Sequence, residues 1–264
     1  MSYNDAYSPE QIALLVNNIG IKKANQPFLQ MLTLGILAGA FIAFGAMFYT
    51  ATITGSTLGL GPTRLLGGMA FSLGLVLVVV AGAELFTGNN LIVIAWAQKK
   101  ISTRQLLRDW TVVYIGNFIG AVASAVILDL SGALNISDGA VMSTAVNIGQ
   151  QKVALTITEL FFRGILCNAL VCLAVWLCVA AHTVSGKILA ILFPISAFVA
   201  LGFEHSIANM YLISIAMLQG YSGITLTGFF YNLSVVTAGN IIGGSVFVAL
   251  IYWLCYLRNA GEPS

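Results

Sequence analysis

Six long stretches of the chain are apolar and almost free of charge. They cover roughly residues 28–54, 65–97, 107–130, 154–181, 187–217 and 226–257. Each exceeds the roughly 20 residues that an α-helix needs to cross the hydrocarbon core of a bilayer. The pattern predicts six transmembrane helices. Because six is an even number, both ends of the chain are expected on the same side of the membrane.

The composition agrees with a protein whose solvent is lipid. Of the 264 residues, 59% are hydrophobic and 8% are charged, whereas an ordinary soluble domain has about 25% charged residues. The mean hydropathy is +0.94. The net charge of +2 comes from few charges without a basic run, which excludes a nucleic-acid-binding protein. We therefore predict an all-α integral membrane protein.

Basic residues cluster on one side of this predicted topology. The termini and the loops between spans two and three and between spans four and five hold Lys22, Lys23, Lys99, Lys100, Arg104, Arg108, Lys187 and Arg258, whereas the opposite loops hold Arg64 and Lys152. The positive-inside rule then places both termini in the cytoplasm. The expected organisation is a cytoplasmic segment over 1–26, a six-helix domain over 27–258 and a cytoplasmic tail over 259–264, in the inner (plasma) membrane of a cell.

A short amphipathic helix is expected before the first span. Ser8 and Gln11 have the spacing of a capping box, with Pro9 at the first helical position. The apolar residues that follow keep the spacing of one helix face, from Ile12 to Ile19. This helix either docks on the cytoplasmic face of the bundle or acts as a moving gate, and docking is the simpler interpretation.

Spans two and five are too long for one straight helix each. A continuous helix over 65–97 would be about 50 Å long at 1.5 Å per residue, against a hydrocarbon core of about 30 Å. Each span also contains a polar interruption near its middle, at 82–90 and at 202–209. We predict that both helices are broken there.

The two interruptions occupy matching places in the two halves of the chain. Glu84 precedes Gly116 by 32 residues, and Glu204 precedes Gly239 by 35 residues. Three spans in each half form a three-plus-three repeat, whose second half enters the membrane in the opposite sense because three is odd. Inverted repeats of this kind place their broken helices together near the midplane and predict a pathway through the protein.

Few side chains in the predicted membrane can carry chemistry. His205 lies mid-membrane in the second interruption, where an ionisable group is expensive and marks function. Glu84 and Glu204 are expected to support the breaks by accepting hydrogen bonds from the freed backbone amides; two lone carboxylates make a poor cage for a metal or sodium ion. Glu159 and Arg163, four residues apart, should form a structural ion pair.

Several motifs together are distinctive. They are Phe71-Ser72-Leu73-Gly74-Leu75, Glu84-Leu85-Phe86-Thr87-Gly88, Gly116-Asn117, Gly164 with Cys167-Asn168, Gly202-Phe203-Glu204-His205-Ser206-Ile207-Ala208-Asn209-Met210, and Gly239-Asn240. In these motifs the chain resembles the formate/nitrite transporter family over nearly all of residues 24–258. The stretch after Gly202 is the most specific of them, since paired glycines alone occur at many helix contacts.

The resemblance implies an aquaporin-like protomer, assembled as a homopentamer with one anion pore in each protomer and no cofactor. Matched by position, the substrate pathway comprises the central histidine His205, the loop threonine Thr87, the vestibule lysine Lys152 and the polar residues Asn168 and Asn240. The apolar constrictions map to Phe71 and Leu75 on one side of the histidine, and to Leu85, Phe86, Val171 and Phe198 along other parts of the path.

These residues suggest how a weak-acid anion such as formate could cross. Lys152, the only basic residue of its loop, is expected to concentrate anions. An unpaired charge cannot pass apolar rings cheaply, so we expect His205 either to relay a proton that neutralises the anion or to act as a hydrogen-bond donor only. Nitrite and hydrosulfide are alternative substrates. An intramembrane enzyme would need a facing nucleophile and base, which the adjacent His205 and Ser206 do not provide. A neutral-solute channel of aquaporin type would need paired Asn-Pro-Ala loops, and neither interruption contains proline.

Overall fold

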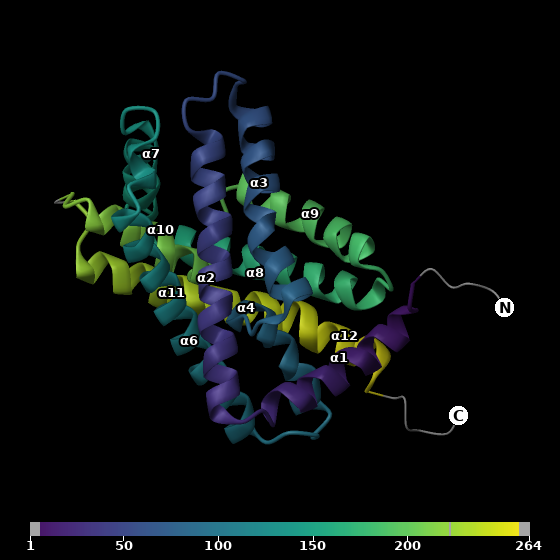
Figure 1. Cartoon of the computed structure of the whole chain (residues 1–264). Helices are drawn as coiled ribbons and strands as arrows, with labels where there is room; N and C mark the ends of the chain where they lie inside the picture. Colours follow the sequence, from purple (N-terminus) through teal and green to yellow (C-terminus); the bar gives the residue numbers. More distant parts are fainter. Residues whose placement is uncertain (1–5, 222, 259–264) are drawn as a thin grey trace.

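The computed structural model describes residues 6–221 and 223–258, and the first residues of the chain and the predicted tail over 259–264 lie outside this description. The regular secondary structure of the described residues is helical, apart from a single backbone bridge between Ala6 and Ala181. In chain order the helices are α1 (Pro9–Ala24), α2 (Phe28–Ile53), α3 (Leu60–Val76), α4 (Phe86–Asn89), α5 (Val93–Ala97), α6 (Thr103–Leu130), α7 (Ala140–Val153), α8 (Ile157–Ala180), α9 (Val184–Ala200), α10 (Ser206–Leu218), α11 (Leu226–Gly244) and α12 (Ile251–Tyr256). Figure 1 shows their arrangement.

The six predicted spans and both predicted breaks are confirmed. Within the described residues, five helices are long and apolar enough to cross a membrane: Phe28–Ile53, Leu60–Gly82, Thr103–Leu130, Ile157–Ala180 and Leu226–Tyr256. Two of them continue through π-helical turns, at Leu77–Gly82 after α3 and at Ser245–Leu250 after α11. The second span resumes after its break as Phe86–Ala97, and the fifth span consists of the two shorter helices α9 and α10.

The two halves of the chain pack in the same way. In the first half α2 lies against α6, where Gly35 meets Gly116; in the second half α8 lies against α11, where Gly164 meets Gly239. A Cβ atom on either of the later two glycines would come within about 3 Å of the Cα atom of its partner, so the backbones touch. This close packing of equivalent helices supports the predicted three-plus-three repeat.

Helix α1 docks on the bundle, as the sequence pattern predicts. Ser8 and Gln11 form the predicted capping box, and Ile12 and Val16 are buried. The helix packs against α5, α8 and α12, and the 3₁₀ turn at Asn90–Ile92. In Figure 1 it lies at the lower right, across the molecule from α7. We refer below to the α1 side and the α7 side of the protein.

Helix α7 was not predicted, because its residues lie outside the apolar stretches and were expected to form the loop between spans three and four. It is the counterpart of α1 in the second half: each short helix precedes the first span of its half and carries a lysine one residue before its end, Lys23 in α1 and Lys152 in α7. The repeat unit therefore includes a short helix in addition to its three spans.

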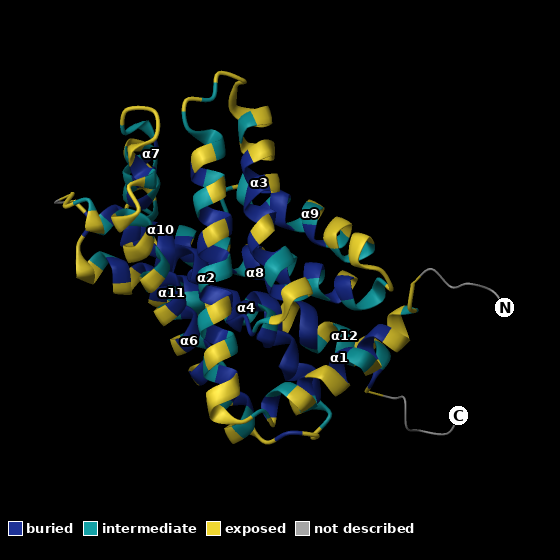
Figure 2. Cartoon of the chain, viewed as in Figure 1, coloured by how far each residue is buried: buried dark blue, intermediate teal, exposed yellow. Residues whose placement is uncertain are grey.

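Apolar side chains cover much of the outer surface. Phe44 and Phe48 of α2, Ile119 of α6, Leu166 of α8 and Phe230 of α11 all belong to the exposed large hydrophobics. Figure 2 shows exposed residues along the outward faces of these long helices, with buried residues in the centre. Such a surface suits contact with lipid, while polar side chains are gathered inside.

Candidate functional site: two broken helices and a buried histidine

Both breaks use a glycine in the left-handed region followed by extended backbone. Gly82 has φ +90° and precedes the extended residue Ala83. Gly202 has φ +71° and lies between the end of α9 at Ala200 and the start of α10 at Ser206. Glycine adopts positive φ without the steric cost of a Cβ atom. The chain therefore leaves each helix, crosses the protein interior for a few residues and re-enters a helix at Phe86 or Ser206.

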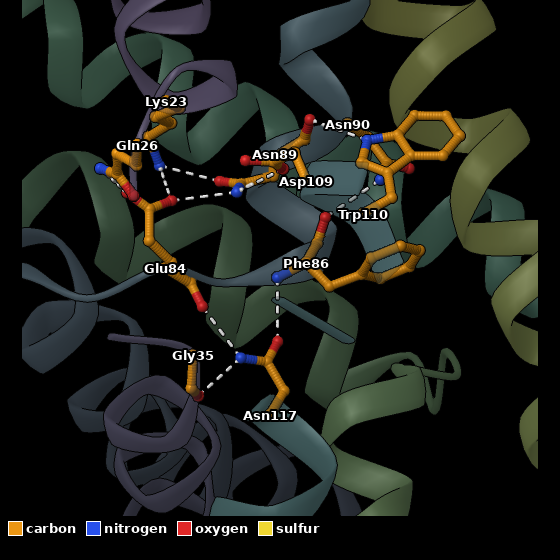
Figure 3. A network of polar contacts seen from close by, with 10 residues as sticks. All are labelled: Lys23, Gln26, Gly35, Glu84, Phe86, Asn89, Asn90, Asp109, Trp110 and Asn117. Atoms are coloured by element: carbon orange, nitrogen blue, oxygen red, sulfur yellow. Dashed lines mark hydrogen bonds and ion pairs between the residues drawn. The ribbon is translucent and has the colours of Figure 1, made fainter. Parts of the chain in front are cut away.

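Asn117 of α6 supports the first break. Its Nδ2 donates to the carbonyl oxygens of Gly35 (2.8 Å) and Glu84 (2.9 Å), and its Oδ1 accepts from the backbone N–H of Phe86 at 2.9 Å. Figure 3 shows these three bonds around the amide. One fully buried side chain thus satisfies backbone groups that the broken helix leaves free, which would otherwise be costly inside a membrane.

Asn240 of α11 does the same for the second break. Its Nδ2 donates to the carbonyl oxygens of Gly164 (2.8 Å) and Glu204 (2.9 Å), and its Oδ1 accepts from the N–H of Ser206 at 2.9 Å.

The prediction that Glu84 and Glu204 accept from the freed amides was wrong. An asparagine can both donate to carbonyls and accept from an N–H, whereas a carboxylate can only accept.

The carboxylate of Glu84 belongs instead to a polar network on the α1 side. Lys23 Nζ lies 2.7 Å from Glu84 Oε2 and donates to Asn89 Oδ1 at 2.8 Å. Asn89 Nδ2 donates to Glu84 Oε2 (3.0 Å) and to Asp109 Oδ1 (2.9 Å), and Gln26 donates to Glu84 Oε1 at 3.0 Å. These contacts, drawn in Figure 3, attach α1 to the second half of the broken span. We call Lys23, Glu84, Asn89 and Asp109 the α1-side network.

An equivalent α7-side network comprises Lys152, Glu204, Asn209 and Asn232. Lys152 Nζ donates to both carboxylate oxygens of Glu204, at 2.9 and 3.1 Å, and Asn209 Nδ2 donates to Glu204 Oε2 at 2.6 Å and to Asn232 Oδ1 at 2.8 Å. Lys152 is thus not the lone loop cation that the sequence suggested. It lies at the end of α7, largely buried, with its charge paired.

His205 and Thr87 meet between these two networks. His205 Nε2 lies 3.0 Å from Thr87 Oγ1, and both side chains are buried. The other ring nitrogen, Nδ1, accepts from the backbone N–H of Ala208 at 3.1 Å. Since Nδ1 is an acceptor, the neutral imidazole carries its hydrogen on Nε2 and donates it to Thr87. The threonine hydroxyl then keeps its own hydrogen for another acceptor.

Aromatic rings close the α7 side of the histidine. Phe198 stacks on the His205 ring with centroids 5.9 Å apart, and Phe71 meets Phe198 edge-on at 5.6 Å. Both phenylalanines are buried, at 3% and 4% exposure, so no open channel passes between them. Val171 of α8 is also buried in the same hydrophobic core. The sequence-matched residues Phe71 and Phe198 therefore form one apolar barrier beside the histidine.

A cavity of about 700 Å³ lies on the α1 side of the barrier. Leu75 and Leu85 line it, together with Lys23, Glu84 and Asn89 of the α1-side network. Leu75 was expected beside Phe71, but Phe71 is not among the residues that line this cavity. The two leucines thus give apolar surface to a cavity that the charged network also lines.

The ring of Phe86, which is expected at an apolar constriction, packs against α6. Its ring packs edge-on against Tyr114 and Trp110 of α6, with centroids 4.9 and 6.2 Å away, as Figure 3 shows for Trp110. Phe86 is absent from the lining of the cavity. Its ring anchors the restarted helix to α6, and its backbone N–H serves the Asn117 contact.

Asn168 holds the core of the second half together. Its Nδ2 donates to Asn240 O at 2.7 Å and to Asn90 Oδ1 at 3.1 Å. It is fully buried and is not among the residues that line the cavity on the α1 side.

The predicted ion pair between Glu159 and Arg163 is present, at 3.1 Å. Within the described residues, no group of three or more His, Cys, Asp or Glu side chains could hold a metal ion.

Most members of the two networks were not predicted from the sequence as site residues. Lys23 was predicted only as a cytoplasmic charge, and no role was predicted for Asn89, Asn209, Asp109 or Asn232. The spacing could have revealed them. In each half the lysine precedes the first contact glycine by 12 residues, from Lys23 to Gly35 and from Lys152 to Gly164. The fourth network residue precedes the supporting asparagine by eight, from Asp109 to Asn117 and from Asn232 to Asn240.

Comparison with known proteins agrees with this architecture. The family described as formate/nitrite transporter matches residues 10–254. Formate channel FocA of Escherichia coli strain K12 is 38% identical, with 97% of this chain and 96% of the relative aligned. A probable formate transporter of Methanothermobacter thermautotrophicus is 39% identical, over 96% of this chain and 98% of the relative.

Two solved structures are similar to the whole fold. A pentameric formate channel with formate bound superposes with a TM-score of 0.82 at 39% identity, covering 88% of this chain and 98% of that chain. An ion channel of the same family gives a TM-score of 0.82 at 31% identity, over 94% and 98%. These matches are to channels and transporters, so the intramembrane enzyme considered above is excluded. The chain belongs to the formate/nitrite transporter family.

Proposed function

We propose that this protein is a formate channel that works as a homopentamer in the inner membrane, with one pore in each protomer. The observation that carries the proposal is the buried contact between His205 and Thr87, made where two broken helices meet. The relatives named formate channels favour formate over nitrite or hydrosulfide as the substrate. A single protomer contains the complete constellation, which agrees with separate pores.

The α1 side faces the cytoplasm in this proposal. The loop after α5 and the start of α6 carry Lys99, Lys100, Arg104 and Arg108 on that side, near the two basic residues at the end of α1. Cytoplasmic loops of membrane proteins are enriched in lysine and arginine. The α7 side, with Lys152 and Arg64, then faces outward.

Paired lysines draw formate towards the pore without binding it tightly. Lys23 and Lys152 are each bonded to a glutamate, so each network presents an ammonium group whose charge is already compensated. An ammonium group donates three hydrogens. An anion can therefore share the lysine for a moment and move on, whereas a free buried ammonium would hold it.

At the centre His205 acts as a hydrogen-bond donor. The hydrogen on Nε2 and the hydroxyl of Thr87 can both turn towards a formate oxygen. A relay through the ring would require an imidazolium with hydrogen on both nitrogens, but Nδ1 already accepts from Ala208 N–H. Of the two roles that the sequence left open for His205, the geometry favours donation over a proton relay.

The apolar barrier selects the form that crosses. Moving an unpaired charge past Phe71 and Phe198 costs far more free energy than moving the neutral acid. Formate that has taken up a proton from the aqueous side passes as formic acid and releases the proton beyond the barrier. Flux is therefore coupled to protons, and its net direction follows the formate and proton gradients.

Uptake into proteoliposomes tests this function. Formate, nitrite and hydrosulfide are offered at matched gradients and at several pH values to the wild type and to His205→Phe, which keeps an aromatic ring but has no donor. We expect fast formate uptake that increases with acid outside and is lost in the variant. Preferential uptake of nitrite or hydrosulfide would reassign the substrate, and uptake of none of the three would refute the proposal.

A further inference from the structure

The two networks are alike at three positions and different at the fourth. A lysine, a glutamate and an asparagine are common to both, as Lys23, Glu84 and Asn89 on the α1 side and as Lys152, Glu204 and Asn209 on the α7 side. The fourth position is Asp109 on α6 and Asn232 on α11, and both of these side chains are fully buried. Only the α1 side therefore has a second buried carboxyl group.

The hydrogen bonds show which form of Asp109 fits its place. Asn232 accepts from Asn209 at 2.8 Å through Oδ1 and donates to the carbonyl oxygen of Lys152 at 2.9 Å through Nδ2. Asp109 accepts from Asn89 at 2.9 Å through Oδ1, but its Oδ2 has no partner within the described residues. An unpartnered neutral hydroxyl costs far less free energy to bury than an unpartnered charged oxygen, so burial of Oδ2 favours the protonated carboxyl.

The count of charges agrees with a protonated group. Lys23 provides one positive charge and lies directly against Glu84 at 2.7 Å. Arg108 is the sequence neighbour of Asp109, but its guanidinium donates to the backbone oxygen of Gln26, at 3.1 Å from both terminal nitrogens. Helix α1 packs against α6 and contains Glu10 and Lys22 in addition to Lys23, whereas the helices α2, α4, α5 and α10, which also pack against α6, contain no Asp, Glu, His, Lys or Arg. Within the described residues, neither Lys23 nor Arg108 forms an ion pair with Asp109.

We propose that Asp109 carries a proton in the resting protein and is a positioning residue, acting through Asn89, that keeps the α1-side network neutral. The proposal rests on the anion transport proposed above. Lys23, Glu84 and Asn89 line the cavity of about 700 Å³, and Asp109 lies behind Asn89, outside its lining. An anion in the cavity meets a neutral network while Asp109 keeps its proton.

Loss of that proton to the aqueous phase on the α1 side changes the network. Two carboxylates then face one ammonium group, and the resulting negative charge repels an anion in the cavity. The α7-side network has no such group, because Asn232 does not titrate. Anion access from the α1 side therefore falls at alkaline pH, and access from the α7 side does not fall for this reason.

Infrared spectroscopy of the purified protein tests the proton itself. The carbonyl stretching band of a protonated carboxylic acid is compared in wild type and Asp109→Asn, with and without aspartate labelled with ¹³C at its side-chain carboxyl. We expect a band that shifts with the label and is lost in Asp109→Asn, and an additional band in Asn232→Asp. The absence of a band in the wild type, or a band that the aspartate label does not shift, would overturn the proposal.

Transport measured from each side tests the consequence. Asp109→Asn installs the residue that the other half of the repeat already has, so the fold has a precedent for it. With channels oriented in one direction, formate flux from the α1 side should be equal in both proteins at acidic pH and about three- to tenfold faster in the variant at alkaline pH. Asn232→Asp should gain the same sensitivity on the α7 side.

Equal flux of Asp109→Asn and wild type at every pH would contradict the gating consequence. Failure of the wild type to conduct formate would refute the proposed function instead. In that case the infrared experiment still decides whether Asp109 is protonated, because it does not depend on transport.

Discussion

His205 Nε2 and Thr87 Oγ1 lie 3.0 Å apart although 118 residues separate them in the chain. The contact exists because each residue follows a helix break in its own half of the repeat, and the two breaks meet inside the protein. Nδ1 of the histidine is occupied by Ala208 N–H, which directs the hydrogen of the neutral ring towards Thr87. The histidine therefore donates to the threonine, and the threonine hydroxyl keeps its own hydrogen for a third group.

Replacing Thr87 tests whether its hydroxyl serves the anion. Thr87→Val keeps the shape and removes both the donor and the acceptor, so we expect formate uptake to fall about tenfold, as loss of one hydrogen bond of ~1.4 kcal/mol implies. Thr87→Ser keeps the hydroxyl and should retain most of the uptake. Initial rates in proteoliposomes measure both. Equal rates for Thr87→Val and wild type would exclude a role for the hydroxyl.

The asparagines that support the breaks should matter for stability before they matter for transport. Asn117→Leu and Asn240→Leu each remove three buried hydrogen bonds to backbone groups. We expect each to cost about 3 kcal/mol of unfolding free energy, because the backbone groups stay buried without partners. Thermal unfolding in detergent measures this. Asn25→Leu, at an exposed position, is the control and should change stability much less.

Much of this architecture could be predicted from the sequence. The six apolar stretches, the polar interruptions at Glu84 and Glu204, and the repeated Gly-Asn pairs predicted six spans, two breaks and an inverted repeat, because length and hydropathy decide what can cross a bilayer. His205 was identified because an ionisable residue in mid-membrane is rare. All of these signals are local in the sequence.

The partners of the charged residues could not be predicted from local signals. Glu84 pairs with Lys23, which is 61 residues away, and Glu204 pairs with Lys152, which is 52 residues away. A glutamate at a break could accept from backbone amides or from a lysine, and only the packed fold decides between them. The direction of the Phe86 ring, which faces Trp110 and Tyr114 of α6, also depends on the packed fold. Position in a motif does not fix the direction of a side chain.

The ion pair of Lys152 and Glu204 predicts a compensation between variants. Lys152→Met and Glu204→Gln each leave the partner charge largely buried and unpaired, which should cost about 3 kcal/mol or more. The double variant removes both charges and should be more stable than the sum of the two effects predicts. A double-mutant cycle of unfolding free energies measures the coupling. Additive effects would show that the two charges do not interact.

Helix contact through glycine gives a sharper test of packing. A Cβ atom at Gly120 would overlap the carbonyl oxygen of Ile36, where α2 and α6 touch. Gly120→Ala should therefore force the helices apart and lower the melting temperature strongly. Gly61 of α3 has open space around its Cβ position, so Gly61→Ala is the matched control and should be neutral or slightly stabilising. A Gly120→Ala protein with unchanged melting temperature would mean that the two backbones are not in contact.

The attachment of α1 should depend on one of two adjacent lysines. Lys23 bonds to Glu84 and Asn89 on the broken span, whereas its neighbour Lys22 is exposed. Lys23→Met removes these contacts, and we expect hydrogen exchange of the α1 amides to accelerate about tenfold, as loss of ~1.4 kcal/mol of local stability implies. Lys22→Met has the same change in net charge and should leave the exchange unaltered. Equal acceleration in both variants would mean that general charge, and not the contact with Glu84, holds α1 against the bundle.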